Sequence, residues 1–279
     1  MIAVKGITKK FDNFVAVNQI DFEMREGMVF GLIGTNGAGK STLLRMISGV
    51  CRADAGEILI DELSVYDNPA AKEKVFFIAD EPYFFAHSNA VDMEKYYAMV
   101  YKTFNKDEFY KLMTQFGLDA KRKIATYSKG MKKQLAFILG LSARTDYLLC
   151  DETFDGLDPV MRQAIKSLLA KEMGERGLTP VIASHNLREL EDICDTVGLL
   201  HKGGVLLSKD LDEMKCCIQK VQCVFKDETE YEKAAAICRI MKTERRGSLY
   251  TLTIRGEKDE TLQKFDSLET IFCEVLPLT

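Results

Sequence analysis

The feature that most constrains this fold is a glycine-rich loop between an apolar segment and a helical one. The loop reads Gly34-Thr-Asn-Gly-Ala-Gly-Lys-Ser41, after the apolar residues 28–33 and before a helix expected to run from about Lys40 to Ser48. Glycines let backbone N–H groups approach a phosphate without a Cβ in the way, and the helix N-terminus adds free amides and a positive dipole end. An ordinary glycine-rich turn is the alternative, but the strand–loop–helix order favours a P-loop that binds a nucleoside triphosphate.

Two side chains of this P-loop are expected to contact the triphosphate and its Mg²⁺ ion. Lys40 would reach the β- and γ-phosphates, and the Ser41 hydroxyl would ligate Mg²⁺. The backbone of the surrounding residues would supply the remaining phosphate contacts. The expected phosphate-binding set is Gly34, Thr35, Asn36, Gly37, Ala38, Gly39, Lys40, Ser41 and Thr42.

Two carboxylates follow a second apolar segment, residues 148–150. Burying charge at a strand end is costly unless a cation or water is held there. In P-loop proteins the first carboxylate, here Asp151, typically completes the Mg²⁺ shell, which leaves Glu152 to orient or deprotonate the attacking water. Helix capping is the alternative for an isolated Asp-Glu pair, but its position after a P-loop favours the metal and base interpretation.

A histidine follows another short apolar strand. His185 comes directly after residues 181–184, and strand ends on the phosphate side of an open α/β sheet are where ligands bind. A lone histidine is more often structural, and His87 and His201 have no comparable setting. We therefore expect a functional role for His185 alone among the three.

The order of predicted elements indicates a mostly parallel sheet with flanking helices, because short apolar strands alternate with helical stretches. From about residue 88 to 142 the chain reads as helical, with breaks near 103–106, 117–119 and 126–128, and Asn89 with Asp92 marks its start. A helical block is therefore inserted into an α/β core. The expected strands are residues 2–8, 20–25, 57–60, 74–79, 148–151 and 180–184.

Charge and cysteine usage exclude several classes. A net charge of −4 and a pI near 5.6 argue against a general nucleic-acid binder, and we expect the basic runs 121–123 and 132–133 to be solvated helix faces. Eight cysteines without a CxxC pair indicate reduced thiols in a cytosolic protein. The sequence has no signal-peptide pattern and no apolar run approaching ~20 residues, so we expect a chain that is soluble by itself.

The motifs resemble, in order and spacing across residues 1–216, those of the ATP-binding subunits of ABC transporters, most closely bacterial exporter-type subunits. The segment Tyr127–Met131 is similar to the signature motif that distinguishes this family among P-loop proteins. The segment that ends at Asp158 resembles the loop that passes between two subunits, and Ser184–His185 resembles the switch histidine. Phe11 stands where the family usually places an aromatic residue that stacks on adenine.

The resemblance implies a fold and two cofactors. The fold is α/β: a P-loop NTPase core with a mostly parallel sheet, an antiparallel β subdomain and an inserted helical subdomain at about 88–142. Residues 1–216 would form this ATPase domain, and residues 217–279 a small accessory α/β domain. The implied cofactors are ATP and Mg²⁺.

It also implies a mechanism. Two ATP-binding subunits, identical or sister copies, would meet head to tail and enclose ATP between one P-loop and the partner's signature helix, with Ser128, Gly130 and Asp158 facing the nucleotide. Glu152 would be the general base, Lys40 and His185 would stabilise charge on the γ-phosphate, and Ser41 and Asp151 would hold Mg²⁺. Closing and opening of this dimer would drive a separate transmembrane permease from the cytoplasmic face of the membrane, and the resemblance favours export over import.

Three departures from the family pattern stand out. Asp80 replaces a usual glutamine near Mg²⁺, which would add negative charge beside the metal and give tighter metal coupling or a changed water position. The alternative is that Asp80 simply faces solvent. Lys129 and Met131 are unusual within the signature, and Thr153 replaces a frequent proline without obvious chemical consequence.

The remaining segments are less specific. Aromatic residues at Tyr83–Phe85 are candidates for docking the permease. After residue 217 we expect a strand at 221–225, a helix at Glu228–Met241, a strand at 250–254, a short helix near Glu260–Phe265 and an element at Ile271–Leu276. A structural or dimer-supporting role is favoured there over ligand sensing.

Three other functions compete with transport as interpretations of this sequence. A soluble non-transport ABC ATPase with a regulatory, ribosome-linked or DNA-linked role usually carries two ATPase units, long coiled-coil arms or zinc modules, which this sequence lacks. A P-loop kinase or GTPase would not explain Tyr127–Met131. A catalytically dead binding module conflicts with the presence of Lys40, Asp151, Glu152 and His185.

Overall fold

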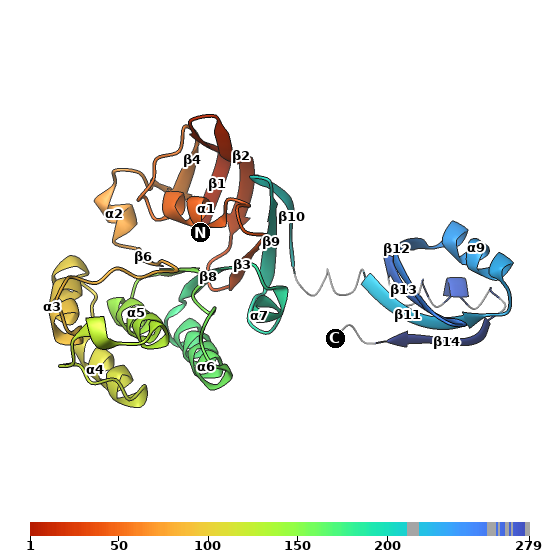
Figure 1. Cartoon of the computed structure of the whole chain (residues 1–279). Helices are drawn as coiled ribbons and strands as arrows, with labels where there is room; N and C mark the ends of the chain where they lie inside the picture. Colours follow the sequence, from red (N-terminus) through yellow and green to blue (C-terminus); the bar gives the residue numbers. More distant parts are fainter. Residues whose placement is uncertain (211–217, 256–260, 262, 266–267, 269, 277–279) are drawn as a thin grey trace. The chain divides into compact units, whose positions relative to one another are not determined.

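The computed structural model describes residues 1–210, 218–255, 261, 263–265, 268 and 270–276. The chain forms two compact units, Met1–Ser208 and Lys209–Thr279 (Figure 1). The boundary expected between residues 216 and 217 lies outside the described residues and stays a prediction.

The first unit begins with an antiparallel sheet in the order β2-β1-β4-β5. Strands β1 (Ile2–Phe11) and β2 (Phe14–Met24) are longer than the sequence predicted, because their pairing continues to Phe11 opposite Phe14. The turn between them needs a left-handed residue, which Asp12 supplies with φ 50°. Strands β4 (Ala55–Ile60) and β5 (Leu63–Ser64) complete the sheet.

A six-stranded sheet lies at the centre of the first unit, in the order β10-β9-β3-β8-β7-β6. The pairs β3–β8, β3–β9, β6–β7 and β7–β8 are parallel, which confirms the mostly parallel sheet. The carboxyl ends of β3, β7 and β8 therefore meet at one edge. The strands are β3 (Phe30–Ile33), β6 (Val75–Ile78), β7 (Tyr147–Asp151), β8 (Thr179–Ser184), β9 (Thr196–His201) and β10 (Gly204–Asp210).

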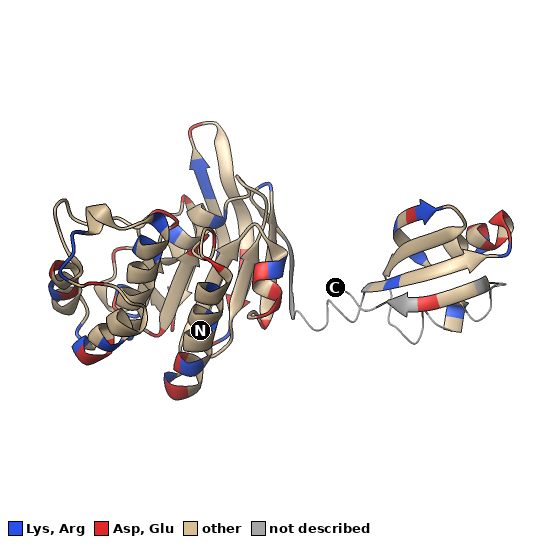
Figure 2. Ribbon diagram, turned by 60° about the horizontal axis from the view of Figure 1, so that its bottom comes forward, with Lys and Arg blue, Asp and Glu red and all other residues tan. Residues whose placement is uncertain are grey.

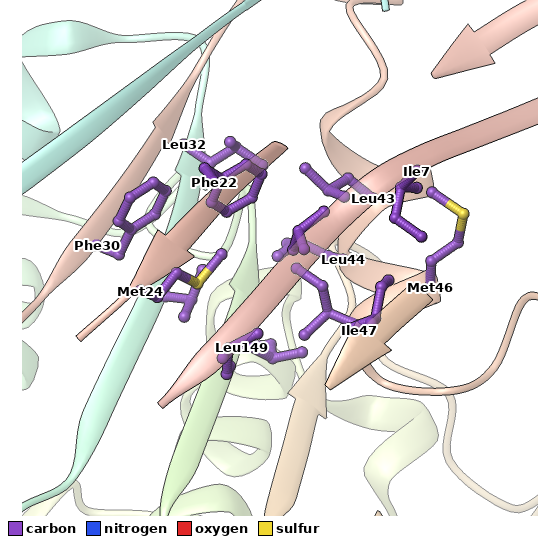
Figure 3. Close-up of a cluster of buried hydrophobic side chains, with 14 of the residues drawn as sticks. Ile7, Phe22, Met24, Phe30, Leu32, Leu43, Leu44, Met46, Ile47 and Leu149 are labelled. Carbon is purple, nitrogen blue, oxygen red and sulfur yellow. The ribbon is translucent and has the colours of Figure 1, made fainter. Parts of the chain in front are cut away.

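Helix α1 (Lys40–Ile47) joins the two sheets into one core. Its residues Leu43, Leu44 and Ile47 are fully buried, and Figure 3 shows them among side chains from both sheets, such as Ile7 and Leu149. Full burial of one such side chain stabilises the fold by about 1.5–3 kcal/mol. The core therefore fixes α1, and with it the start of the helix at Lys40, against β7.

Helices occupy the stretches of this block before, between and after the expected breaks, but the stretch 120–125, also expected to be helical, contains only the start of a 3₁₀ turn. Helix α3 (Ala90–Val100) begins with a capping box in which Asn89 and Asp92 exchange hydrogen bonds. Helix α4 (Lys106–Gln115) and a 3₁₀ turn (Ile124–Thr126) lead to α5 (Lys129–Ala143), which packs on β6. Three further helices connect strands of this unit: α2 (Pro69–Lys72), α6 (Pro159–Arg176) and α7 (Leu187–Glu191).

The second unit is a four-stranded antiparallel sheet in the order β12-β13-β11-β14, with α9 (Glu228–Ile237) packed on it. The prediction that this helix extends to Met241 was wrong. The helix ends at Ile237, because Arg239 already pairs with Arg255 of the neighbouring strand. Near the expected helix at Glu260–Phe265, Thr261 and residues 263–265 are helical, and Glu260 lies outside the described residues. The strands are β11 (Ile218–Phe225), β12 (Arg239–Arg246), β13 (Leu249–Arg255) and β14 (Thr270–Leu276).

The helices of the first unit carry charged residues of both signs. Figure 2 shows Lys and Arg interspersed with Asp and Glu along the helices of the first unit. Within the described ranges, every helix is too short or too polar to cross a bilayer.

Candidate active site

Two glycines of the glycine-rich loop, Gly34 and Gly39, lie so close to neighbouring backbone that a larger residue would not fit at either position. A Cβ on Gly39 would lie 2.4 Å from the Ala16 carbonyl oxygen, and one on Gly34 would lie 2.6 Å from that of Leu200. Gly39 also has φ 103° and is the N-cap of α1 without a side-chain cap. The first amides of α1 therefore face the loop, in an arrangement suited to an anion.

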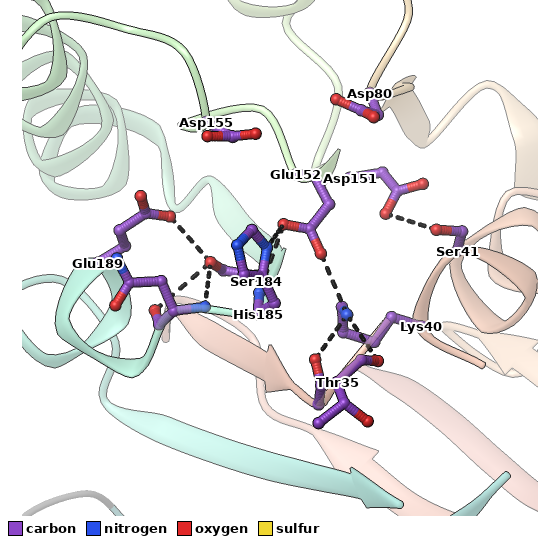
Figure 4. A network of polar contacts seen from close by, with 12 residues as sticks. Thr35, Lys40, Ser41, Asp80, Asp151, Glu152, Asp155, Ser184, His185 and Glu189 are labelled. Carbon is purple, nitrogen blue, oxygen red and sulfur yellow. Dashed lines mark hydrogen bonds and ion pairs between the residues drawn. The ribbon is translucent and has the colours of Figure 1, made fainter. Parts of the chain in front are cut away.

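Lys40 lies at the centre of the site, with 4% of its surface exposed. Its ammonium donates to the Gly34 carbonyl oxygen at 2.7 Å and to that of Thr35 at 3.3 Å. It also pairs with Glu152 Oε1 at 3.1 Å (Figure 4). The sheet edge thus brings the P-loop cation and the predicted general base into direct contact.

Ser41 and Asp151 form a second contact across the same edge. The Ser41 hydroxyl donates to Asp151 Oδ1 at 3.0 Å, and Asp151 is buried at the end of β7. Burial raises the pKa of this carboxyl, an effect that the Ser41 hydrogen bond opposes. A cation beside it would favour the charged form.

These two side chains fit Mg²⁺, because it takes oxygen ligands and is commonly bound by one or two protein groups together with substrate phosphates and water. Across the part of the chain that the structure describes, three or more His, Cys, Asp or Glu side chains do not gather as a metal cage. A Mg²⁺ ion bound here would therefore share its coordination between the protein and the substrate phosphates, and Ser41 and Asp151 would be the protein ligands.

Glu152 is held in an uncommon backbone conformation. Its φ is 47°, in the left-handed region, and its N–H donates to the Ala183 carbonyl oxygen at 3.0 Å. Such strain persists where the surrounding structure enforces it, and it is found at functional sites. Here it directs the carboxylate toward Lys40 and His185.

His185 contacts Glu152 from the end of β8. Its Nδ1 lies 2.8 Å from Glu152 Oε2, and the imidazole is about half exposed. The hydrogen bond to Glu152, together with the negative charge of that residue, raises the pKa of His185. Glu152 therefore has one carboxylate oxygen at Lys40 and the other at His185.

A supporting group behind His185 was not predicted from the sequence. The Ser184 hydroxyl donates to Glu189 Oε2 at 2.8 Å, and Arg162 Nη1 lies 3.4 Å from Glu189 Oε1. The Asn186 side chain caps α7, so the residues after His185 are anchored to a helix. The sequence does show polar residues after the apolar strand β8, but it does not show which side chains they contact in the fold.

Lys133 is the main correction to the sequence analysis. The run 132–133 was expected to be a solvated helix face, but Lys133 is buried and donates to Asp80 Oδ1 at 3.0 Å. It also donates to the carbonyl oxygens of Glu152 and Asp155, each at 2.9 Å. Helical periodicity places a residue on a face but does not identify the segments that cover it. Asp80 follows β6, and its carboxylate is about half exposed beside Lys133.

The other predicted residues lie outside the network of Figure 4. Phe11 is about half exposed near the end of the β1–β2 hairpin, with the Lys9 ammonium 5.4 Å from its ring centroid. Ser128 caps α5 through the Met131 N–H, and Asp158 caps α6. Their predicted contact with a partner's nucleotide requires a second subunit.

Comparison with known proteins gives independent evidence on the family of this chain. A family model described as "ABC transporter" matches residues 17–155. The chain is 30% identical over 263 residues to the ABC transporter ATP-binding protein YtrB of Bacillus subtilis, which spans 93% of this chain and 88% of that protein. It is 30% identical to the bacitracin transport ATP-binding protein BcrA of Enterococcus faecalis, over 77% of this chain and 70% of that one.

A solved structure supports the fold. A dimeric ATP-binding cassette in a post-hydrolysis state, bound to ADP and Pi, superposes with a TM-score of 0.68. The superposition covers 76% of this chain and 99% of that one, at 22% sequence identity. A likeness at this identity concerns the fold alone.

Proposed function

This chain belongs to the ABC transporter family as an ATP-binding, ATP-hydrolysing protein, and from that premise we propose that it powers a separate transmembrane permease in the direction of export. The observation that carries the proposal is the convergence of Lys40, Ser41, Asp151, Glu152 and His185 at one sheet edge. A relative named for bacitracin transport supports the coupling to transport. Resistance to linearmycin in the name of another relative supports export.

We propose that Lys40 exchanges Glu152 for phosphate oxygens when ATP binds. The ammonium is buried and needs an anionic partner, and a triphosphate carries more charge than one carboxylate. Ser41 and Asp151 would hold Mg²⁺, which neutralises charge that develops on the phosphates. Phe11 would stack on the adenine ring.

Release from Lys40 leaves Glu152 free to act as the general base. It would accept a proton from the water whose oxygen attacks the γ-phosphorus, while the bond to the β-phosphate oxygen breaks and ADP and phosphate form. His185, still beside Glu152, would stabilise charge on the γ-phosphate. Removing a general base typically costs ~10²–10⁴-fold in rate.

A second ATP-binding subunit, identical or a sister copy, would complete the site. Ser128, Gly130 and Asp158 would face the nucleotide bound by the partner, at the N-termini of α5 and α6. The dimeric form of the structurally similar cassette supports this arrangement.

The permease would dock beside the helical block, with this chain on the cytoplasmic face of the membrane. Tyr83 is 78% exposed and Phe85 and Tyr96 are also exposed, and their rings pack edge to face around a groove. Aromatic residues of this kind are enriched in interfaces. The second unit would have a structural or dimer-supporting role.

The substitution Glu152→Gln tests this function, and Glu175→Gln is the matched control because Glu175 lies on the exposed face of α6. We expect Glu152→Gln to bind ATP, to lose at least ~100-fold in hydrolysis, and to accumulate as a dimer in light scattering with ATP. The control should turn over and elute like the wild type. Full turnover by Glu152→Gln would remove Glu152 from the role of base and overturn the proposed mechanism.

A further inference from the structure

The Lys133 ammonium connects three separate segments of the first unit. From α5 it reaches Asp80 after β6 at 3.0 Å, and the backbone oxygens of Glu152 and Asp155 at 2.9 Å each. An ammonium has three N–H donors, and these three acceptors use all of them. Asp80 and Asp155 flank Glu152 in Figure 4.

Because the Lys133 ammonium is buried, it needs all three of its hydrogen-bond acceptors. The Lys133 side chain is 11% exposed, so its charge is costly without a counter-charge and hydrogen bonds. Asp80 supplies the counter-charge, and the two carbonyl oxygens satisfy the remaining donors. With its three donors engaged, Lys133 has no donor left for a phosphate.

The two carbonyl groups belong to the turn that carries the proposed base. Glu152 has a left-handed φ, and its carbonyl oxygen also accepts from the Asp155 N–H at 3.2 Å. A second hydrogen bond from a fixed ammonium holds this strained backbone in place, because an uncommon conformation persists only where its surroundings enforce it. Lys133 is therefore placed to set the direction of the Glu152 side chain.

We propose that Lys133 is a positioning residue for ATP hydrolysis and that Asp80 is its counter-ion. The pair holds the Glu152–Asp155 turn on α5, the same helix that Ser128 caps. Asp80 then acts on the reaction through Lys133, in place of the direct role at Mg²⁺ that the sequence suggested. The proposal rests on Glu152 being the general base.

The test compares Lys133→Met, Lys133→Arg, Asp80→Asn and the Lys133→Met/Asp80→Asn double variant, with Lys132→Met on the same helix as control. We expect Lys133→Met to lower kcat about 10–100-fold with KM for ATP within about 3-fold, because the base loses its direction and the P-loop does not change. Lys133→Arg keeps the charge and should recover part of the loss. The control should match the wild type.

Two measurements test the Lys133–Asp80 pair: the kcat of the double variant and the dependence of activity on Mg²⁺ concentration. Because Asp80 acts through Lys133, the double variant should be no slower than Lys133→Met alone. Asp80→Asn should lower kcat and leave the Mg²⁺ concentration for half-maximal activity within about 2-fold. A tenfold or larger shift in that concentration would make Asp80 a metal ligand and overturn its role as counter-ion.

Three outcomes separate this proposal from the proposed function. Wild-type kcat in Lys133→Met, together with inactive Glu152→Gln, would overturn the positioning role and leave Glu152 as base. Full activity in Glu152→Gln would overturn the function itself. A parallel loss of ATP binding and kcat in Lys133→Met would show a general structural role and also contradict the proposal. If Lys133→Met does not fold, the Asp80→Asn Mg²⁺ profile decides.

Discussion

Asp61 provides a prediction whose magnitude follows from the structure. Its carboxylate lies in the turn between β4 and β5 and accepts hydrogen bonds from Lys74 Nζ at 2.6 Å and from the Tyr147 hydroxyl at 2.7 Å. Burial raises the pKa of Asp61, but hydrogen bonds from Lys74, the N-terminal amine and Tyr147 outweigh it and hold the pKa at about 2. Tyr147 is fully buried in β7, so Asp61 ties the antiparallel sheet to the central one.

The expected cost of neutralising Asp61 is about 2 kcal/mol at pH 7. The ordinary pKa is 3.8, and each pKa unit corresponds to ~1.36 kcal/mol. Because the folded-state pKa is the lower one, this stability is fully present above the unfolded pKa and is lost as pH falls through about 2. At pH 3 about half of this contribution should remain. Asn keeps the side-chain shape and tolerates the left-handed φ of 48°.

The assay is urea unfolding of Asp61→Asn, followed by far-ultraviolet circular dichroism at pH 7 and pH 3. Asp67→Asn is the control, because Asp67 is exposed and has a similar φ of 55°. The control should lie within ~0.5 kcal/mol of the wild type. A wild-type free energy of unfolding for Asp61→Asn at pH 7, or an equal deficit at both pH values, would refute the reasoning from charge.

Two further predictions concern packing and the active-site histidine. A Cβ on Gly140 would lie 2.9 Å from Leu148 Cδ1, so Gly140→Ala should lower the thermal midpoint, since overpacking costs ~1–3 kcal/mol against a helix gain of ~1 kcal/mol. Gly174→Ala, with open space around its Cβ, should raise the midpoint; a more stable Gly140→Ala would contradict this. By NMR titration, the pKa of His185 should lie above 6.5 and fall toward it in Glu152→Gln. Equal values in both proteins would contradict the role of Glu152 in the shift.

Much of the site was predictable because its signals are local and the sheet is parallel. The P-loop, Asp151–Glu152 and His185 each follow a short apolar strand, and each can be recognised from a few neighbouring residues. Parallel strands bring their carboxyl ends to one edge, so the three groups had to meet once the strands paired. The contacts of Lys40 with Glu152 agree with that expectation.

Features that depend on distant partners were missed. Seven of the eight residues of β12 are exposed, so Arg239–Arg246 has no alternating pattern, and only its pairing with β13 makes it a strand. Lys133 presents the same difficulty on a helix. Its position in α5 follows from the sequence, but its three acceptors come from residues 80, 152 and 155, whose meeting depends on tertiary packing.

The place of β3 in the central sheet has a consequence during synthesis. This strand lies between β8 and β9, which are made about 150 residues later. At ~5–20 residues per second, a ribosome needs roughly 10–30 s to supply them. For that time Phe30–Ile33 has neither of its strand neighbours. The nascent chain therefore carries an unpaired apolar strand, which makes this the interval in which a chaperone would most reduce aggregation.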